Sequence, residues 1–265
     1  MTLLAYDGVH VAVSGGPNPL GGWNVYEYDQ ETDYQKLSVW GDGYYFTANK
    51  FSGSKVYAVD KEAMIQGAAS ADIQGFDLPG LAIGGFYSPQ ALNAINDDLS
   101  SGPASIVYYA DDAWPGVSFD HLKIWDIDVD WDSPNNSSIS NPQILETTPF
   151  VSVFDNGSFS NLEQPGSPIE IDAIQGTIMN QAQFRKFANY NSAVFNFVVD
   201  TDGSANETAG VRWYEIRQDS DSDSWYIFQE CSYTSRYGKH AWLASMGFDM
   251  YGNIALGYSA MGGTT

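Results

Sequence analysis

The segment Asp219-Ser220-Asp221-Ser222-Asp223-Ser224 has the residue types of a calcium-binding loop. Carboxylates stand at its first, third and fifth positions and Glu230 at the twelfth, which is the spacing at which such a loop presents oxygen ligands to Ca²⁺. Ser224, however, stands where that loop needs a glycine, and Trp225 opens a strand-like run rather than a helix. The favoured interpretation is an acidic hairpin tip between Arg217 and Trp225, with a weak calcium site as the alternative.

A second oxygen-rich loop is Asp200-Thr201-Asp202-Gly203-Ser204, with Asn206 and Glu207 close behind. Hard cations such as Ca²⁺ take carboxylate and amide oxygens, so Asp200 and Asp202 are further metal candidates. The Asp-Gly pair also makes an ordinary turn, which is the favoured interpretation. Nothing in the sequence requires a cofactor, and Ca²⁺ is the ion that either loop would take.

A third segment, 233–242, brings cationic and titratable side chains together with aromatic ones. It contains Arg236, Tyr237, Lys239, His240 and Trp242. Aromatic rings stack on sugar rings and cations meet carboxylate or sulfate, so these five residues form a candidate glycan-binding loop. A more specific hypothesis is a polysaccharide lyase in which Tyr237 and His240 are acid and base and Arg236 neutralises the uronate. A solvent-facing connection between two β units is the favoured alternative.

Composition limits the classes of partner. The 265 residues include 11 Lys and Arg against 33 Asp and Glu, a formal net charge of −22. Binding to nucleic acid or to anionic lipid needs clustered basic side chains, so we exclude both. Hydrophobic residues make up 43% of the chain and aromatic residues 15%, which indicates a folded core, and no apolar run is long enough for membrane insertion.

The elements that must position these side chains are short strands in a repeated order. A strand with small residues precedes a more aromatic strand at 9–13 and 23–29, 43–48 and 55–60, 105–109 and 122–128, and 193–199 and 211–217, and a fifth opening strand covers 249–257. Repeats of this kind, about 40–60 residues apart, are typical of propeller blades. The sequence therefore predicts an all-β fold, a β-propeller of sialidase-like architecture with an incomplete set of blades, as a single domain or domain fragment over 1–265.

Three segments carry more local predictions. The alternation over 125–132 places Trp, Ile, Val and Trp on one face and four aspartates on the other, which indicates a strand. The segment 61–67 predicts a short helical turn that ends at Gly67. The segment 177–185 fits either a helix or a strand by its pattern alone.

Several runs together carry a family resemblance. They are 34–49, 129–131, 211–217, 225–230 and 249–259, with the letters RWYEIR and GNIALGYS in the last part of the series. In this order they resemble a propeller-like domain of large secreted and surface proteins of environmental, often marine, bacteria. The resemblance implies a β-propeller, a secreted or cell-surface location and a strand over 177–187. The family's activity is undefined, so the resemblance implies no catalytic residues.

We therefore expect an extracellular β-propeller module of a secreted or cell-surface bacterial protein, which binds a glycan or a protein or has a structural role. Both ends lie close to predicted strands, so we expect a piece of a longer protein whose signal peptide is outside this sequence. One alternative is a carbohydrate-active enzyme, a polysaccharide lyase or glycosidase, with its site at the channel mouth. The other is a scaffold whose partner is another segment of the parent protein.

Overall fold

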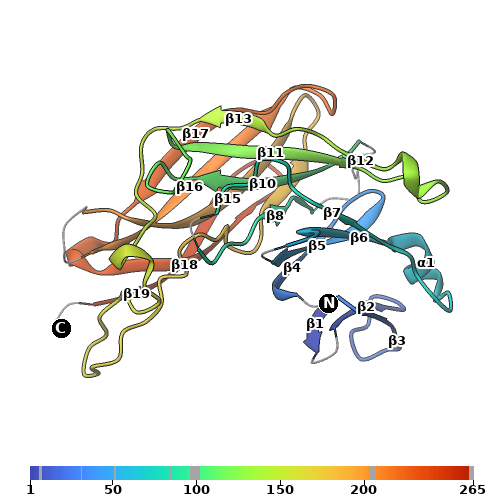
Figure 1. The fold of residues 1–265 in the computed structure, drawn as a ribbon, viewed down its shortest axis with the longest axis horizontal. Coiled ribbons are helices and arrows are strands. Elements are labelled where there is room, and N and C mark those ends of the chain that lie inside the picture. The colour runs from blue at the N-terminus through green and yellow to red at the C-terminus, as the bar shows by residue number, and fades with distance from the viewer. Residues whose placement is uncertain are drawn as a thin grey trace.

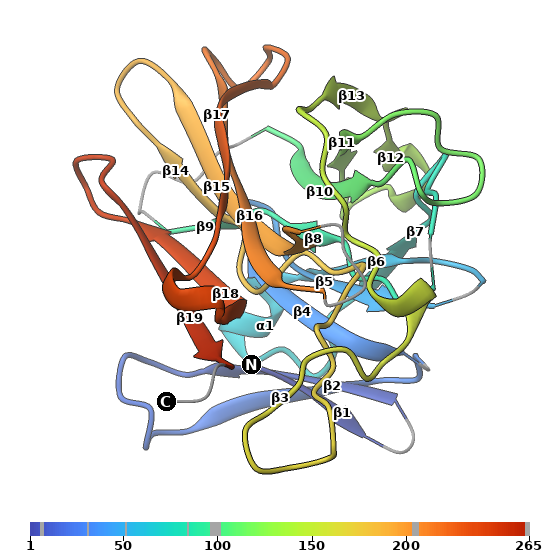
Figure 2. The same cartoon turned by 90° about the vertical axis from the view of Figure 1, so that its left-hand side faces the viewer.

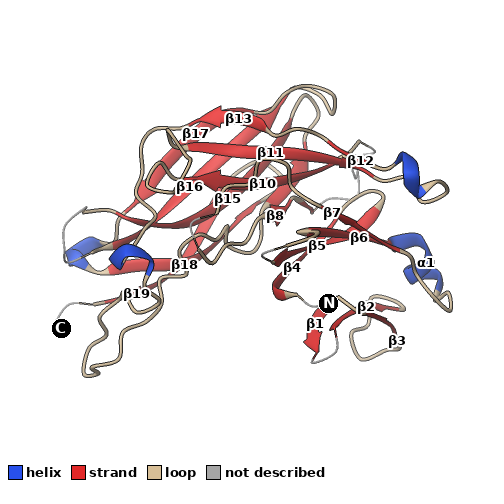
Figure 3. Cartoon of the chain, in the orientation of Figure 1, coloured by secondary structure: helices blue, strands red, loops and turns tan. Residues whose placement is uncertain are grey.

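The computed structural model describes residues 1–5, 8–30, 32–50, 52–83, 85–95, 102–202 and 207–262. These residues form nineteen strands in five sheets, one short α-helix and three 3₁₀ helices (Figure 1). Strands make up most of the regular structure (Figure 3), so the prediction of an all-β fold is confirmed. No helix among the described residues has the length and apolarity to cross a membrane.

The first two sheets come from the N-terminal part of the chain and are antiparallel. The first sheet contains, in order, β1 (Thr2–Ala5), β2 (Gly8–Ser14) and β3 (Trp23–Tyr28). The second contains β4 (Asp33–Val39), β5 (Gly43–Asn49), β6 (Val56–Asp60) and β7 (Ile73–Phe76). Helix α1 (Lys61–Gln66) follows β6 directly and contacts β2, β3 and β5.

The other three sheets hold the rest of the strands. The third contains β8 (Gln90–Ala91), β10 (Ala104–Ala110), β11 (His121–Asp128) and β12 (Ser138–Ile139), with β13 (Gln143–Glu146) also paired to β11. The fourth contains β9 (Asn93–Ala94), β14 (Gln183–Lys186), β15 (Asn191–Asp200), β16 (Ala209–Gln218) and β17 (Tyr226–Tyr233). The fifth is the hairpin of β18 (His240–Phe248) and β19 (Ile254–Met261). The 3₁₀ helices are η1 (Pro134–Asn136), η2 (Asp155–Gly157) and η3 (Arg236–Gly238).

The four predicted strand pairs are all antiparallel neighbours in these sheets. They correspond to β2 with β3, β5 with β6, β10 with β11, and β15 with β16. The fifth prediction was incomplete, because residues 249–253 form the turn of the last hairpin and β18 precedes them. A break in the register between Trp242 and Ser245, with Leu243 at φ 47°, interrupts the alternation that would have revealed β18.

Local predictions fared differently according to how much they depended on long-range pairing. Helix α1 begins where Asp60 accepts a hydrogen bond from the Ala63 backbone at 3.1 Å and ends at Gly67 with φ 66°, as predicted. In β11, Trp125 and Ile127 are buried whereas Asp126 and Asp128 are exposed, which confirms the alternation over 125–128, but the strand ends at Asp128 and residues 129–132 lie outside it. Within 177–187, strand structure is limited to β14 and to a single bridge between Thr177 and Ser88.

The largest hydrophobic core lies where the second, third and fourth sheets meet. It includes Tyr45 on β5, Tyr109 on β10 and Phe197 on β15. The rings of Tyr109 and Phe197 stack with centroids 3.8 Å apart, so the third sheet packs directly against the fourth. Smaller clusters join the first sheet and α1 to the second, and the fifth sheet to the fourth.

Candidate functional site

The acidic segment 219–223 is the turn between β16 and β17, so the predicted hairpin tip is confirmed. The backbone N–H of Asp223 donates to the carbonyl of Ser220 at 3.1 Å, and Ser220 Oγ donates to the Asp223 carboxylate at 2.7 Å. Short polar side chains of this kind stabilise tight turns. The turn places its three carboxylates on the wall of a hollow.

The hollow has a volume of about 770 Å³ and lies between the third and fourth sheets. Its walls are the start of β10 with part of β11, the β14–β15 turn and the β16–β17 turn. Figure 2 shows both turns of the fourth sheet projecting on one side of the molecule, beside the third sheet. The charged and amide side chains on the walls include Asp126, Lys186, Asn189, Asp219, Asp221 and Asp223. A hollow of this size is typical of a small-ligand site.

Of the carboxylates in the hollow, Asp221 makes the most contacts with other side chains of the protein. Lys186 Nζ lies 2.8 Å from one carboxylate oxygen, and Asn191 Nδ2 donates to the other at 2.7 Å. These contacts tie the β16–β17 turn to the β14–β15 hairpin. The Asp221 carboxylate therefore fixes the shape of the hollow.

Asp126 reaches the hollow from the third sheet. Ser105 Oγ donates to its carboxylate at 2.7 Å, and Trp225 Nε1 donates to the same Ser105 hydroxyl at 3.3 Å. The Asp126 side chain is exposed to water, yet protein atoms surround it within the hollow. This partial desolvation raises the pKa of the Asp126 carboxyl, and the hydrogen bond from Ser105 opposes the rise.

Phe187 and Tyr190 form an aromatic wall in the β14–β15 turn. Their rings stack with centroids 4.8 Å apart, and the Arg217 guanidinium lies 4.3 Å from the Tyr190 ring and 3.3 Å from the Phe228 ring. Other protein groups therefore cover the faces of the Tyr190 ring, and these contacts hold the wall rigidly. A ligand in the hollow would meet polar groups and ring edges rather than an open stacking platform.

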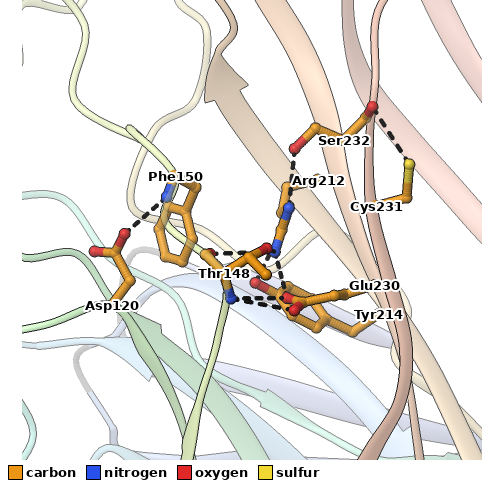
Figure 4. Close-up of polar contacts among 8 residues, drawn as sticks. All are labelled: Asp120, Thr148, Phe150, Arg212, Tyr214, Glu230, Cys231 and Ser232. Carbon is orange, nitrogen blue, oxygen red and sulfur yellow. Dashed lines mark hydrogen bonds and ion pairs between the residues drawn. The ribbon is translucent and has the colours of Figure 1, made fainter.

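Glu230 does not join the three turn aspartates. It lies four residues along β17 from Tyr226, which is roughly 13 Å at the rise of a strand. Its carboxylate forms an ion pair with Arg212 and accepts a hydrogen bond from the Thr148 backbone at 3.1 Å (Figure 4). The spacing that suggested a calcium loop therefore does not bring the four carboxylates to one point.

Arg212 is the centre of this second polar cluster. Only 5% of the residue is exposed. Besides Glu230, its guanidinium donates to Tyr214 Oη at 2.9 Å, to Thr148 Oγ1 at 2.7 Å and to Ser232 Oγ at 3.2 Å. Figure 4 shows these partners surrounding the guanidinium. The cluster fastens the segment around Thr148 to the fourth sheet, and it is structural.

One further group of acids was missed by the sequence analysis. Asp111, Asp112 and Asp120 have ligand atoms within 4.8 Å of one another, and in the described part of the chain they are the one such group of three or more His, Cys, Asp or Glu side chains. Asp111 accepts from Ser152 at 2.6 and 2.7 Å, and Asp120 accepts from Phe150 at 2.7 Å. The adjacent pair Asp111-Asp112 was the only sequence signal. Asp111 and Asp120 thus hold the segment from Phe150 to Ser152 in place.

Asp200 is the last residue of β15, and Asp202 lies in the turn that follows. Asp200 accepts from the backbone of Asp202 at 3.2 Å and of Thr208 at 3.1 Å, and Thr208 Oγ1 donates to Asp202 at 2.8 Å. The two carboxylates thus shape a turn. Gly203, Ser204 and Asn206 of the predicted loop lie outside the described residues.

The 233–242 segment connects β17 to β18 through η3, and the structure separates its residues. Arg236 and Lys239 are exposed, and Tyr237 lies in η3 with its side chain outside the described part. His240 Nδ1 accepts from the Ala209 backbone at 3.2 Å, and burial lowers the pKa of its imidazole. Trp242 is only 6% exposed and belongs to the cluster that joins the fourth and fifth sheets. The segment lies at the opposite end of β17 from the hollow, about 25 Å away for eight strand residues.

Comparison with known proteins gives no relative. No protein-family model matches the chain, and neither the curated proteins nor the solved structures give a significant match. The resemblance described for the sequence therefore stays a prediction.

Proposed function

We propose that this chain is a carbohydrate-binding module whose ligand occupies the hollow between the third and fourth sheets. The hollow itself carries the proposal, because carboxylates and amides from separate parts of the chain face one space of about 770 Å³. Ionised carboxylates such as Asp219 and Asp223 only accept hydrogen bonds, and the neighbouring hydroxyls of a sugar are donors that suit them. Asn189 adds an amide that can donate and accept.

The module is proposed to have a propeller-like arrangement in a secreted or cell-surface protein. In support, the sheets follow one another along the chain, apart from β9, which joins the fourth sheet, and contacts join β1 to β4, β4 and β5 to β8, and β15 and β16 to β18. Successive, mainly antiparallel sheets in contact are what blades would give. A crystal structure would test this, because blades must radiate from a common axis, whereas two stacked layers would contradict the proposal.

The binding proposal is tested by filling the hollow. Ser222 is exposed in the β16–β17 turn and lines the hollow, so Ser222→Trp should obstruct it without disturbing the core. The matched control is Ser133→Trp, at an exposed serine that does not line the hollow. Both variants and the unmodified protein would run through native gels that contain neutral plant and algal polysaccharides.

We expect retention of the unmodified protein and of Ser133→Trp by at least one polysaccharide, and loss of retention for Ser222→Trp. Equal retention of all three proteins would place the binding surface elsewhere and overturn the proposal. Retention of none would favour the scaffold alternative, in which the partner is another segment of the parent protein.

A glycosidase is the second candidate, and the raised pKa of the Asp126 carboxyl favours it. Glycoside hydrolysis uses one protonated and one ionised carboxyl group, whose pKa values the protein must push apart. Asp126 would be the acid and an aspartate of the β16–β17 turn its partner. New reducing ends that appear with the unmodified protein and disappear with Asp126→Asn would establish the enzyme, and binding without new ends would exclude it for the polysaccharides used.

A further inference from the structure

The charges around the hollow are strongly unbalanced. Its described lining holds four carboxylates, Asp126, Asp219, Asp221 and Asp223, against the single ammonium of Lys186. That ammonium lies 2.8 Å from Asp221, so its charge is largely offset within the wall. The formal balance is three negative charges facing a ligand-sized space.

Neighbouring cations do not correct this balance. The Arg217 guanidinium is held between the Tyr190 and Phe228 rings and lies 2.6 Å from the Glu215 carboxylate, which offsets its charge. The exposed cations Arg236 and Lys239 lie at the other end of β17, beyond the screening length of physiological salt. The field within the hollow is therefore negative, and a concave wall strengthens it.

Accepting our proposed function, on which this step rests, we infer that the hollow takes neutral or amine-bearing sugar units and excludes units that carry carboxylate or sulfate. A uronate or a sulfate ester would face like charges, and the carboxylates of the walls would offer it no donors. A protonated amino group offers three donors and the opposite charge. The order of affinity should be amino sugar first, neutral sugar second and acidic sugar last.

This order reverses what the 233–242 segment suggested. Its arginine and lysine would attract acidic polysaccharides, whereas the hollow repels them. The two surfaces therefore make opposite predictions about the same set of ligands, and a single titration series can separate them.

Three tetrasaccharides of equal length provide the test: glucosamine, N-acetylglucosamine and galacturonic acid tetramers, which are cationic, neutral and anionic at mildly acidic pH. Calorimetric titration of the unmodified protein at low salt should rank them in that order, and added salt should weaken the glucosamine tetramer most. The double variant Asp126→Asn, Asp223→Asn keeps an oxygen acceptor for Ser105 and for Ser220. It should weaken the glucosamine tetramer by about tenfold or more and change the N-acetylated tetramer much less.

Asp132→Asn is the control, because Asp132 is exposed and does not line the hollow. It should leave all three affinities unchanged. Tightest binding of the galacturonate tetramer, lost in Ser222→Trp, would overturn the charge preference and leave carbohydrate binding intact. Binding of no tetramer, with spermidine bound tightly, would overturn carbohydrate binding itself and identify the hollow as a site for cationic ligands of another kind.

Discussion

Two polar clusters of this protein, the one around Arg212 and the one around the hollow, use charged side chains in opposite ways. The Arg212 guanidinium is buried and is surrounded by Glu230, Tyr214, Thr148 and Ser232, all within hydrogen-bonding distance. In the hollow, Asp126, Asp219 and Asp223 line an open space, and each carboxylate accepts a single side-chain hydrogen bond from the described part of the protein. One cluster satisfies its charges within the protein, and the other leaves capacity for a ligand.

The difference separates stability from binding. A buried charge whose partners are all protein groups holds two segments together, and its loss leaves those partners unsatisfied. An exposed carboxylate among like charges adds little to stability and can even lower it. The same substitution of charge by a neutral side chain should therefore have opposite effects in the two clusters.

The largest effect is expected for Arg212→Met. This change keeps much of the side-chain volume but leaves the Glu230 carboxylate without its counter-charge and Tyr214 without its guanidinium donor. Breaking a buried pair in this way costs about 3–5 kcal/mol, so the free energy of unfolding measured in urea should fall by that amount.

Arg236→Met is the matched control for this experiment. Arg236 is exposed in η3, so its loss should change the free energy of unfolding by no more than about 0.5 kcal/mol. Equal effects of the two substitutions would show that the Arg212 cluster has no special structural role.

Much of the frame that carries both clusters could be predicted from sequence. Alternation identified β11, and small or aromatic runs identified four strand pairs, because these signals depend on residues a few positions apart. The hollow could not be predicted, since Asp126 and the 219–223 turn are about ninety residues apart and meet only when two sheets pack. Glu230 shows the converse, because spacing grouped it with Asp219, whereas the strand register places it opposite Tyr214, where its carboxylate forms an ion pair with Arg212.

Trp242 shows a different limit of prediction from sequence. As part of an apparent connection, it was a candidate for stacking on a sugar. In the structure β18 already begins at His240, so Trp242 lies within a strand and is buried between sheets. Composition identifies aromatic residues well, but only the strand boundary decides which of them face a partner.

Lys36 on β4 is intermediate between the Arg212 cluster and the hollow. It should give the next largest effect on the free energy of unfolding. It is only 6% exposed, donates to the Ile178 carbonyl and lies 4.9 Å from the Tyr34 ring, and neither partner carries a charge. Burial lowers the pKa of the Lys36 ammonium to about 7. Above that pH the folded protein holds a neutral amine, whereas the unfolded chain stays protonated up to about pH 10.

Unfolding therefore takes up a proton in this window, and the free energy of unfolding should rise with pH. From pH 7 to 9 the rise due to Lys36 should be about 2 kcal/mol. Urea denaturation of the unmodified protein and of Lys36→Met at both pH values would measure it. The difference between the two proteins should shrink by that amount, whereas the exposed Lys239→Met should follow the unmodified protein. A constant difference would show that Lys36 stays charged.

The smallest effect on stability is expected for Asp126→Asn in the hollow. What matters is whether this substitution stabilises or destabilises the fold. Asp126→Asn keeps an oxygen for the Ser105 hydroxyl and removes a charge whose ionisation the surroundings disfavour. A carboxyl whose pKa is raised in the folded protein lowers stability once it ionises, so the neutral amide should slightly stabilise the fold at neutral pH. Because desolvation rather than repulsion between carboxylates raises this pKa, the gain should persist at high salt. The urea midpoints of Asp126→Asn and of the unmodified protein, measured at low and high salt, would show this gain.

The same Asp126→Asn protein should bind the glucosamine tetramer less tightly. A substitution that stabilises the fold and weakens the complex identifies a side chain whose charge serves a ligand rather than the sheets around it. If Asp126→Asn instead destabilised the protein as Arg212→Met does, the carboxylate would belong to the structural kind of cluster, and the hollow would lose its strongest claim to be a binding site.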